Sequence, residues 1–507
     1  MSNKPLYTSP DWTFETIEEA WKVIDDIAKN KFGLDYYDAQ MEIVTYEEML
    51  NNYSSVGMPS MYNHWSFGKS YIRDHQSYVS GQSGLAYEMI VNTDPAIAYL
   101  MENNTMTMQA LVMAHAVCGH ASFFKNNYLF KEWTQADSIV DYLVFAKNYI
   151  AECEYKYGAQ DVELTLDAAH ALKYHGIDKY KRRTGIKKSE IQRRKEAWVK
   201  NLAESMKADW DMDQIKKSIA DTDEVLKKLS ENRRGFPEEN ILYFLEKNSQ
   251  GIADWQKEIL RIVRKISQYF YPQMQTKLMN EGWASFIHYH LMTELQEQGY
   301  ITPGSYMEFL HSHSSVCCQR SYKQMQGFNP YALGFAMFRD IERICKEPTD
   351  EDKYWFPDFA GNPDWMGVCK QAVELYRDES FIQKFLSPKV IRDFKMFTVH
   401  DDEDLNYFRV DEVHDDEDVI SLRDKLSKQY NINEMVPHIE ITDVDWEDTR
   451  TLELTHWVKD GKLLDHDSAK ETTEYLKYLW GYPIHWENET DESLEQAFKD
   501  LVELLIP

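Results

Sequence analysis

The sequence predicts a mainly α-helical protein with a large helical body and a small C-terminal α+β domain. Apolar residues recur at helical spacing through most of residues 1–395. Residues 438–465 instead alternate polar and apolar side chains around a Lys-Asp-Gly turn, which is typical of a β-hairpin. The chain has 507 residues. Single hydrophobic cores stop growing at roughly 250–300 residues, so more than one domain is expected.

The helical body divides into successive segments. The first, residues 12–32, has Thr13 or Thr16 as a suitable N-cap and Gly33 as a stop signal. Residues 41–50 fit a short strand that runs into a helix. Pro272 is expected to interrupt the helical pattern of 237–298, because proline cannot continue a helix interior. The other expected helices are 94–102, 105–124, 134–156, 160–174, 302–316, 330–346, 363–377 and 378–386.

An acidic linker is expected at 396–419, before the C-terminal α+β domain at 420–507. His-Asp-Asp-Glu-Asp occurs in this region twice, at 400–404 and 414–418, and such charge density favours a solvated linker or two acidic turns. A calcium loop is the alternative, although the DxDxDG ligand spacing is absent. After the hairpin, a helix over 467–479 and a strand at Tyr-Pro-Ile-His-Trp-Glu complete the domain.

Residues 178–236 form a charged helical excursion from the body. They hold the only concentrated positive charge of the chain, in the segment Lys-Tyr-Lys-Arg-Arg-Thr-Gly-Ile-Lys-Lys and in a later Lys-Lys-Leu-Ser-Glu-Asn-Arg-Arg. The excursion is either a solvated helical hairpin or a docking arm for an acidic partner.

Charge and composition exclude several classes of protein. A net charge of −29 repels phosphate backbones and anionic membranes, which argues against nucleic-acid binding. It favours cations or basic partners, or serves solubility alone. The six cysteines include no CxxC pair, so neither a thiolate zinc site nor a disulfide framework is expected. The N-terminus has no apolar h-region and no run of 18 apolar residues occurs, which predicts a soluble cytoplasmic protein without membrane insertion.

Two histidines lie five residues apart in the apolar segment 109–127. His115 and His120 should be buried there, and a buried neutral imidazole needs a hydrogen-bond partner on each nitrogen or a metal ion on one. Zinc-binding helices place histidines four apart, about 40° from each other around the axis, whereas five residues give about 140°. The rings therefore converge only if the helix is distorted, for example by a one-residue bulge, or ends between them. Gly119 permits either, and both structural and metal-binding roles stay open.

A second polar stripe lies on the helix expected at 160–174. Glu163, Asp167 and His170 follow at i, i+4 and i+7 on an otherwise apolar helix, and Glu154 lies upstream. Carboxylates and an imidazole on one face suit a metal site or a proton relay. A stripe of buried salt bridges is the alternative.

A third segment, 276–292, places Glu281 and His288 seven residues apart, about 20° from each other around the axis. The small residues Ala284 and Ser285 on the same face would let another helix or a metal approach. Asn-Glu-Gly-x-Ala at 280–284 resembles the second zinc-ligand helix of gluzincin metallopeptidases, in which the Glu binds zinc, so the body is expected to be zincin-like.

Further polar residues lie downstream and in an aromatic loop. His311 and His313 follow on the helix expected at 302–316, and His64 lies in the loop 53–71, a kind of segment that often carries function. Arg339 is expected to pair with one of the buried acids, or else to bind a substrate carboxylate.

These residues suggest a divalent-metal site, with zinc as the expected ion. His115, His120 and Glu281 would hold it and leave one coordination position for water. Because Ala116 stands where HExxH motifs have their Glu, Glu154 or Glu163 would act as the base. The oxyanion would be stabilised by His288 or His313. The supporting residues would be His64, Asp167, His170 and Arg339.

Five segments together resemble the SpoVR (stage V sporulation protein R-like) family. They are YSSVGMPSMYNHWSFGKSY, MAHAVCGHASFFKNN, YGAQDVELTLDAAHAL, MNEGWASFIHYH and NPYALGFAMFRDIE. The likeness runs from about Leu34 to Phe397 and resumes in the C-terminal domain. It implies a cytoplasmic protein linked with spore cortex formation in sporulating bacteria. In other bacteria it implies a stress response, with a stress-associated serine protein kinase and a von Willebrand A-type protein as partners.

Three functions are compatible with the sequence. The first is a metal-dependent hydrolase of peptide or amide bonds. The second is a non-enzymatic regulator or adaptor that acts with the kinase and uses the acidic surface or the basic excursion for docking. The third is carboxylate-bridged di-iron chemistry on Glu163, Asp167, His170 and Glu281, although the chain lacks the paired ExxH motifs of such bundles.

Overall fold

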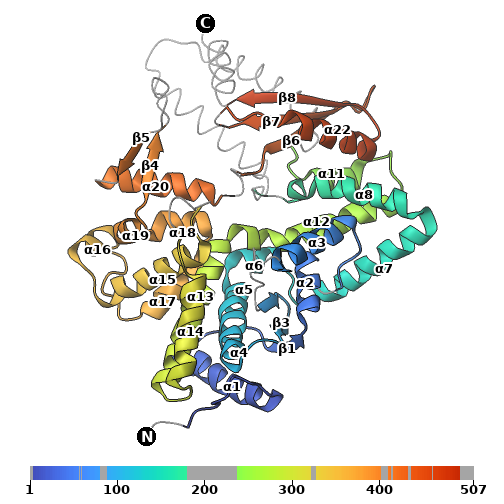
Figure 1. Cartoon of the computed structure of the whole chain (residues 1–507). Coiled ribbons are helices and arrows are strands. Elements are labelled where there is room, and N and C mark those ends of the chain that lie inside the picture. The colour runs from blue at the N-terminus through green and yellow to red at the C-terminus, as the bar shows by residue number, and fades with distance from the viewer. Residues whose placement is uncertain are drawn as a thin grey trace, which may run out of the picture. The chain divides into compact units, whose positions relative to one another are not determined.

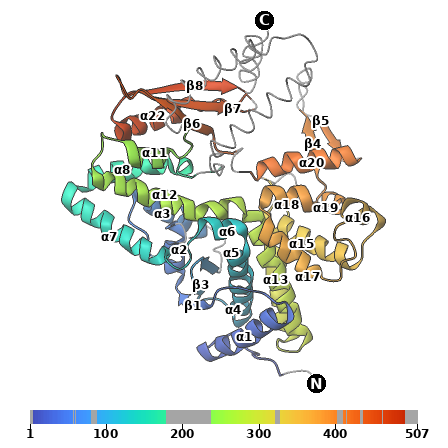
Figure 2. The same cartoon turned by 180° about the vertical axis from the view of Figure 1, so that it is seen from behind.

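The computed structural model describes residues 4–55, 58, 60–79, 88–177, 179, 237–320, 327–400, 409–412, 415–431, 435–459 and 461–490 (Figures 1 and 2). The expected charged excursion at 178–236 lies outside the described residues, apart from Lys179. The chain divides into two compact units, each built from two segments. Unit 1 comprises Met1–Ala159 and Gln268–Met435, and unit 2 comprises Gln160–Ser267 and Val436–Pro507.

The first helix of unit 1 has the expected cap. The helix α1 (Phe14–Asp26) continues into a short π-helix, η1 (Ile27–Lys31). Thr13 and Thr16 form a reciprocal capping box, in which each hydroxyl accepts from the other residue's backbone N–H. Gly33 follows with a φ of +59°, a conformation that glycine adopts without strain.

A three-stranded sheet follows, in the order β1-β3-β2. The strand β1 (Ala39–Val44) runs parallel to β3 (Ala96–Met101), and β2 (Glu88–Val91) runs antiparallel to β3. The strand β1 leads into α2 (Tyr46–Ser54), as expected for residues 41–50, and α3 (Trp65–Val79) follows.

The helix expected at 94–102 is wrong, because these residues form the central strand β3. Five of the six residues of β3 are buried, so its apolar run shows no alternation. Periodicity alone cannot distinguish such a short run from a buried helix.

The core of unit 1 is built around the helix α13 (Lys277–Glu297), which packs against α15 (Pro330–Lys346) and against the π-helix η2 (Met113–Ala121). The segment η2 continues α4 (Met106–Val112) and leads into α5 (Ser122–Asn126); α13 lies alongside this run in both views (Figures 1 and 2). The other helices of this unit are α6 (Tyr128–Trp133), α7 (Ile139–Tyr157), α14 (Pro303–Val316), α16 (Asp350–Trp355), α17 (Trp365–Leu375), α18 (Asp378–Phe385) and α19 (Pro388–Asp393).

The expected interruption at Pro272 is also wrong. The helix α12 (Asp254–Gln275) runs through this proline and ends three residues later. Tyr269 and Tyr271, in the helical turn before Pro272, are buried. Proline removes one backbone hydrogen bond from a helix interior, and the burial of neighbouring side chains is a tertiary contribution that favours the helix despite this loss.

The acidic region differs from the expected linker. Residues 396–419 contain the antiparallel pair β4 (Phe397–His400) and β5 (Arg409–Glu412), and the first turn of α20 (Asp416–Gln429). Asp415 caps this helix by accepting from the backbone N–H of Asp418, and carboxylates in a first turn are favoured by the helix dipole. The second acidic repeat is therefore a helix start, and α20 packs against α18 in unit 1. Most of the first repeat, at 401–404, lies outside the described residues.

Unit 2 contains a second three-stranded sheet, in the order β6-β7-β8. The strands β6 (His438–Val444) and β7 (Leu452–Val458) form the expected antiparallel pair, and β8 (Ile484–Thr490) runs parallel to β7. The helix α22 (His466–Trp480) lies along this sheet in both views (Figures 1 and 2). The turn between β6 and β7 is not the expected Lys-Asp-Gly but residues 445–451, where Asp445 accepts three backbone N–H groups.

The remaining elements of unit 2 come from the middle of the chain. They are α8 (Ala159–Ala171), the 3₁₀-helix η3 (Lys173–His175), α11 (Ile241–Asn248) and most of α12. The domain boundary thus differs from the expected one, because residues 160–267 group with the C-terminal segment. Among the helices that the structure describes, none has the length and apolar character needed to cross a membrane.

Candidate metal centre

His115 and His120 both lie on η2, where the helix is π-helical. In a π-helix the hydrogen bonds join residues five apart, so residues i and i+5 lie on one face. The two imidazole rings are consequently neighbours, with centroids 4.6 Å apart and an edge-to-face arrangement. The distortion that the five-residue spacing requires is therefore present, and both rings are buried.

The helix α13 brings Glu281 to the two histidines. Its Oε2 lies 3.5 Å from His120 Nε2 and 3.8 Å from His115 Nε2. The helices can approach this closely because Gly119 faces Ala284: a Cβ on Gly119 would lie 2.6 Å from the Ala284 Cα. The three side chains expected to form a metal site thus meet, although 160 residues separate Glu281 from the nearer histidine in the sequence.

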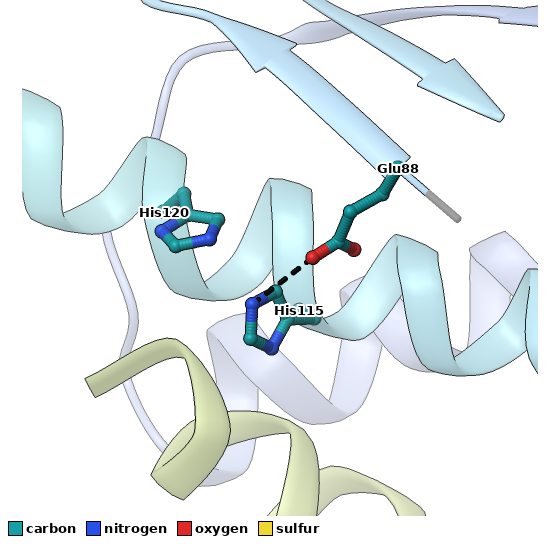
Figure 3. Close-up of side chains that lie close together, drawn as sticks. All are labelled: Glu88, His115 and His120. Atoms are coloured by element: carbon teal, nitrogen blue, oxygen red, sulfur yellow. Dashed lines mark ion pairs between the residues drawn. The ribbon is translucent and has the colours of Figure 1, made fainter. Parts of the chain in front are cut away.

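A fourth group, Glu88, completes the cluster from the start of β2. Its Oε1 lies 3.0 Å from His115 Nε2 (Figure 3). Glu88, His115 and His120 each offer a ligand atom, and these atoms lie within 4.8 Å of one another. Glu88 is not among the site residues expected from the sequence, because its only sequence signal is a lone Glu before Met-Ile-Val.

Hydrogen bonds fix which nitrogen of each ring faces the centre. His120 Nδ1 lies 2.9 Å from Asn280 Oδ1, and because an amide oxygen only accepts, Nδ1 carries the proton and Nε2 presents its lone pair. His115 Nδ1 lies 2.7 Å from His288 Nδ1, which leaves its Nε2 facing the centre too. Metal-binding histidines are commonly oriented through their other nitrogen in this way.

The centre contains two buried polar atoms without hydrogen-bond partners. They are His115 Nε2, which has Glu88 Oε1 at 3.0 Å but makes no hydrogen bond, and Glu281 Oε2, which lies 3.8 Å from His115 Nε2, too far for a hydrogen bond. Ligand atoms of a tetrahedral zinc site with bonds of about 2.1 Å lie about 3.4 Å apart. The spacings of 3.5 and 3.8 Å are close to this value, so a cation among these atoms would satisfy both orphaned groups.

Burial and neighbouring charges shift the pKa values of Glu88 and Glu281 in opposite directions. Burial, together with the neighbouring Glu281, raises the pKa of Glu88 well above its usual value. Burial would also raise the pKa of Glu281, but His120, His115 and Tyr331 outweigh it and lower this pKa. Burial lowers the pKa of His115 to about 4, so its imidazole is neutral at neutral pH. Neutral imidazoles and an ionised carboxylate are the protonation states that bind a metal.

A cavity of about 360 Å³ opens beside the cluster. The Tyr331 ring stacks on His115 with centroids 6.5 Å apart, and Phe124 stacks on His120 at 6.0 Å. No lysine or arginine is among the described residues that line the cavity. These residues are Tyr53, Met58, Glu88, Met89, Ile90, Val91, His120, Phe124, Tyr269, Phe270, Gln273, Asn280, Glu281 and Tyr331.

His288 and His313 do not face this cavity. His288 Nδ1 lies 2.7 Å from His115 Nδ1, and His288 Nε2 lies 2.7 Å from His313 Nδ1. Both nitrogens of His288 are therefore engaged inside the body, and neither imidazole lines the cavity. The structure therefore does not place these two imidazoles where the expected oxyanion role needs them, and the Tyr331 hydroxyl, which hydrogen-bonds to Glu281, is one of the donors that line the cavity.

The two expected bases also lie elsewhere. Glu154 is half-buried on α7 and does not line the cavity. Glu163 is exposed on α8, which also carries Asp167 and His170. These three residues of α8 belong to unit 2, whereas Glu281 belongs to unit 1, so the carboxylate set expected for di-iron chemistry is divided between the units.

The remaining supporting residues have structural contacts. His64 Nδ1 lies 2.6 Å from Ser66 Oγ and accepts from the Ser66 backbone N–H, at the start of α3. Arg339 pairs with Glu342 on its own helix α15, and its guanidinium lies 5.1 Å from the centre of the Tyr289 ring. Arg339 thus pairs with a buried acid, though not with one of those expected.

Comparison with known proteins identifies the family. Residues 11–435 match the family described as SpoVR like protein, and residues 437–491 match the SpoVR-like C-terminal domain. The chain belongs to the SpoVR family. The limit between the two matches coincides with the limit between the units at Met435 and Val436. The SpoVR resemblance expected from the sequence is thereby confirmed.

A relative in the SpoVR family is the Escherichia coli (strain K12) protein that bears the name uncharacterized protein YcgB. It is 48% identical over 491 residues, which cover 96% of this chain and 94% of the relative. No solved structure matches the chain, so the expected zincin-like character of the body has no structural neighbour in its support.

Proposed function

We propose that this SpoVR-family chain is a metal-dependent hydrolase of peptide or amide bonds, with His115, His120 and Glu281 as ligands. The observation that carries the proposal is the pair of orphaned buried atoms, His115 Nε2 and Glu281 Oε2, beside a cavity. Two imidazoles and one carboxylate form the ligand set of several catalytic zinc sites. Zinc is accordingly the ion that we assign.

The bound ion would supply Lewis acidity and a water made nucleophilic at neutral pH. Glu88 takes the role that Ala116 cannot fill, because its carboxyl group lies on the cavity wall, 3.0 Å from His115 Nε2. Burial raises the pKa of Glu88 in the empty site, but a cation bound beside it would lower this pKa again. Glu88 would then be able to accept a proton from a water and pass it to the leaving amine. The Tyr331 hydroxyl, on the same wall, has a single proton; it would donate this proton to the oxygen of the scissile carbonyl once Glu281 binds the ion instead.

The lining of the cavity favours an uncharged substrate. Two carboxylates and no lysine or arginine are among the described lining residues, so a substrate phosphate or carboxylate would find no counter-charge there. The aromatic rings of Tyr53, Tyr269 and Phe270 provide apolar contact, and Gln273 can hydrogen-bond to an amide. We therefore expect internal or blocked amide bonds next to apolar groups to be cleaved.

Elemental analysis of the full chain purified without chelators tests the metal. We expect one zinc per chain, and its loss in His120→Ala and in Glu281→Gln. His311→Ala is the matched control, because His311 is exposed on α14. A metal-free wild-type protein, or variants that retain zinc, would refute the assignment.

The family supports a wider role as well. We propose a cytoplasmic function in sporulation or stress response, with the serine protein kinase and the von Willebrand A-type protein as partners. The alternative to the hydrolase is a non-enzymatic regulator or adaptor that acts with this kinase. Its acidic surface, which follows from the net charge of −29, would then be the docking surface. Kinase binding by a wild-type protein that holds no metal would favour the adaptor.

A further inference from the structure

A chain of three imidazoles runs from the centre into the body. His115 Nδ1 lies 2.7 Å from His288 Nδ1, and His288 Nε2 lies 2.7 Å from His313 Nδ1. The three residues come from η2, α13 and α14, so three helices contribute to one line of hydrogen bonds. All three side chains are buried.

Aromatic rings enclose the inner part of this chain. Phe309 lies edge-on to His288 at 5.8 Å between centroids, and Phe335 lies edge-on to His313 at 4.7 Å. Tyr289 covers His313 at 5.4 Å. Burial among apolar rings disfavours a charged imidazole, so the three rings are neutral.

A neutral imidazole has one N–H and one acceptor nitrogen. Each of the two hydrogen bonds between imidazoles therefore needs a proton on one of its two nitrogens and a lone pair on the other. This requires both hydrogen bonds to run in the same direction along the three rings. Only two arrangements satisfy both contacts, one that donates away from the metal centre and one that donates toward it.

We propose that a cation on His115 Nε2 fixes the outward direction, so that His288 and His313 are positioning residues that hold the metal ligand in one tautomer and one orientation. The proposal rests on the metal site of the proposed function but not on hydrolysis. A ligand's second nitrogen is usually held by a carboxylate, a carbonyl or water; here a second and a third imidazole take that place.

The protons balance in both directions. When Nε2 of His115 is a ligand, its proton lies on Nδ1 and is donated to His288 Nδ1. The proton of His288 then lies on Nε2 and is donated to His313 Nδ1, which leaves the proton of His313 on its own Nε2. In the opposite direction His313 and His288 each carry their proton on Nδ1, and His115 carries it on Nε2, 3.0 Å from Glu88 Oε1.

Each arrangement holds three protons on three rings. Reversing the direction of the two hydrogen bonds therefore leaves the net charge of the three imidazoles unaltered. One proton leaves at His115 Nε2 and one arrives at His313 Nε2. The tautomer of His313 therefore reports on the occupation of a site two residues away along the hydrogen-bond chain.

NMR of the ¹⁵N-histidine-labelled full chain, loaded with Zn²⁺, tests the direction without any substitution. We expect the Nε2–H tautomer for both His288 and His313. An Nδ1–H tautomer for His288 in the zinc-loaded protein overturns the proposal. A wild-type protein that binds no Zn²⁺ overturns this proposal together with the proposed function, whereas binding with the wrong tautomer overturns this proposal alone.

The affinity for Zn²⁺ of His288→Phe provides a second test. We expect it to fall 10–100-fold, the usual effect of removing the group that orients a ligand. His290→Phe is the matched control, because His290 lies on the same helix α13 and pairs with Glu342 instead of the centre. Wild-type affinity in folded His288→Phe, or an equal loss in His290→Phe, contradicts a positioning role.

Discussion

At the scale of single residues, the two carboxylates of the centre have different positions, and we propose different roles for them. Glu281 lies between the two histidines, 3.5 and 3.8 Å from their Nε2 atoms, whereas Glu88 contacts His115 from the strand side. A ligand and a base are distinguishable by substitution, because removal of a ligand releases the metal and removal of a base does not.

We therefore predict that Glu88→Gln retains zinc but lowers the hydrolysis of blocked peptides at least about 100-fold, the usual contribution of a general base. The amide preserves the shape of the side chain and cannot accept the proton. Zinc content and kcat/KM, measured on the same preparation, check this prediction. Loss of zinc from Glu88→Gln would make Glu88 a ligand instead, and unchanged activity would exclude it as the base.

A second residue-scale prediction concerns pH and the buried ion pair between Asp352 and Arg343. Burial alone would raise the pKa of Asp352, but Arg343 at 2.6 Å and hydrogen bonds from Thr349 lower it to about 2. The unfolded value is 3.8, so the pair contributes stability above that pH and loses it as the pH falls through about 2. We expect Asp352→Asn to lower the free energy of unfolding by about 3 kcal/mol at pH 7.

Urea unfolding of both proteins from pH 7 down to pH 3 measures this difference. It should be constant above pH 5 and shrink below pH 4. A difference that stays the same across this range would show that the carboxylate charge of Asp352 does not contribute.

Sequence patterns could identify only some residues of the centre. His115, His120 and Glu281 are polar residues in apolar helical segments, and this contrast marks them in the sequence. Glu88 and Tyr331 have no such contrast. The position of Glu88 depends on the antiparallel pairing of β2 with β3, a contact that no local pattern encodes.

At the scale of elements, the π-helix η2 is the feature that makes the centre possible. The five-residue spacing predicted that a distortion was necessary, because an ideal α-helix would separate the two rings. The strand β3 and the continuous α12 could not be predicted in the same way. Tertiary packing determines the secondary structure of both segments. The strand β3 lies between two other strands, and α12 stays helical through Pro272.

Close helix contacts around α13 give an element-scale prediction. A Cβ on Gly334 of α15 would lie 2.3 Å from the backbone oxygen of Leu278 on α13, and backbone atoms cannot move aside. We expect Gly334→Ala to destabilise the protein by about 3 kcal/mol. Gly68→Ala is the matched control, because Gly68 of α3 is exposed and a Cβ there meets nothing within 4 Å.

Thermal unfolding distinguishes the two glycine variants. Gly68→Ala should be neutral or stabilise by up to about 1 kcal/mol, since alanine favours a helix more than glycine does. Equal midpoints for Gly334→Ala and the wild-type protein would mean that α13 and α15 are further apart than described.

At the scale of the whole molecule, the chain forms two units that each combine distant segments. Unit 2 is held together by contacts such as the hydrogen bond between Thr165 and Tyr478, 3.0 Å, and that from Ser249 to the Leu479 carbonyl. The sequence predicted a C-terminal domain but not its middle segment, because pairings over more than 200 residues leave no local signal.

This division predicts how zinc affects stability. All proposed ligands belong to unit 1, so zinc should stabilise unit 1 and leave unit 2 unchanged. At a free zinc concentration 100 times Kd the stabilisation is about 2.7 kcal/mol. Scanning calorimetry with and without a chelator should therefore show one shifted and one constant transition. An equal shift of both, or none, would contradict the prediction.

The most direct test of the metal centre is anomalous diffraction at the zinc edge from crystals of the full chain grown with zinc. We predict one strong peak about 2.1 Å from His115 Nε2, His120 Nε2 and Glu281 Oε2. Zinc bound only elsewhere, with these three atoms left without a peak among them, would contradict it.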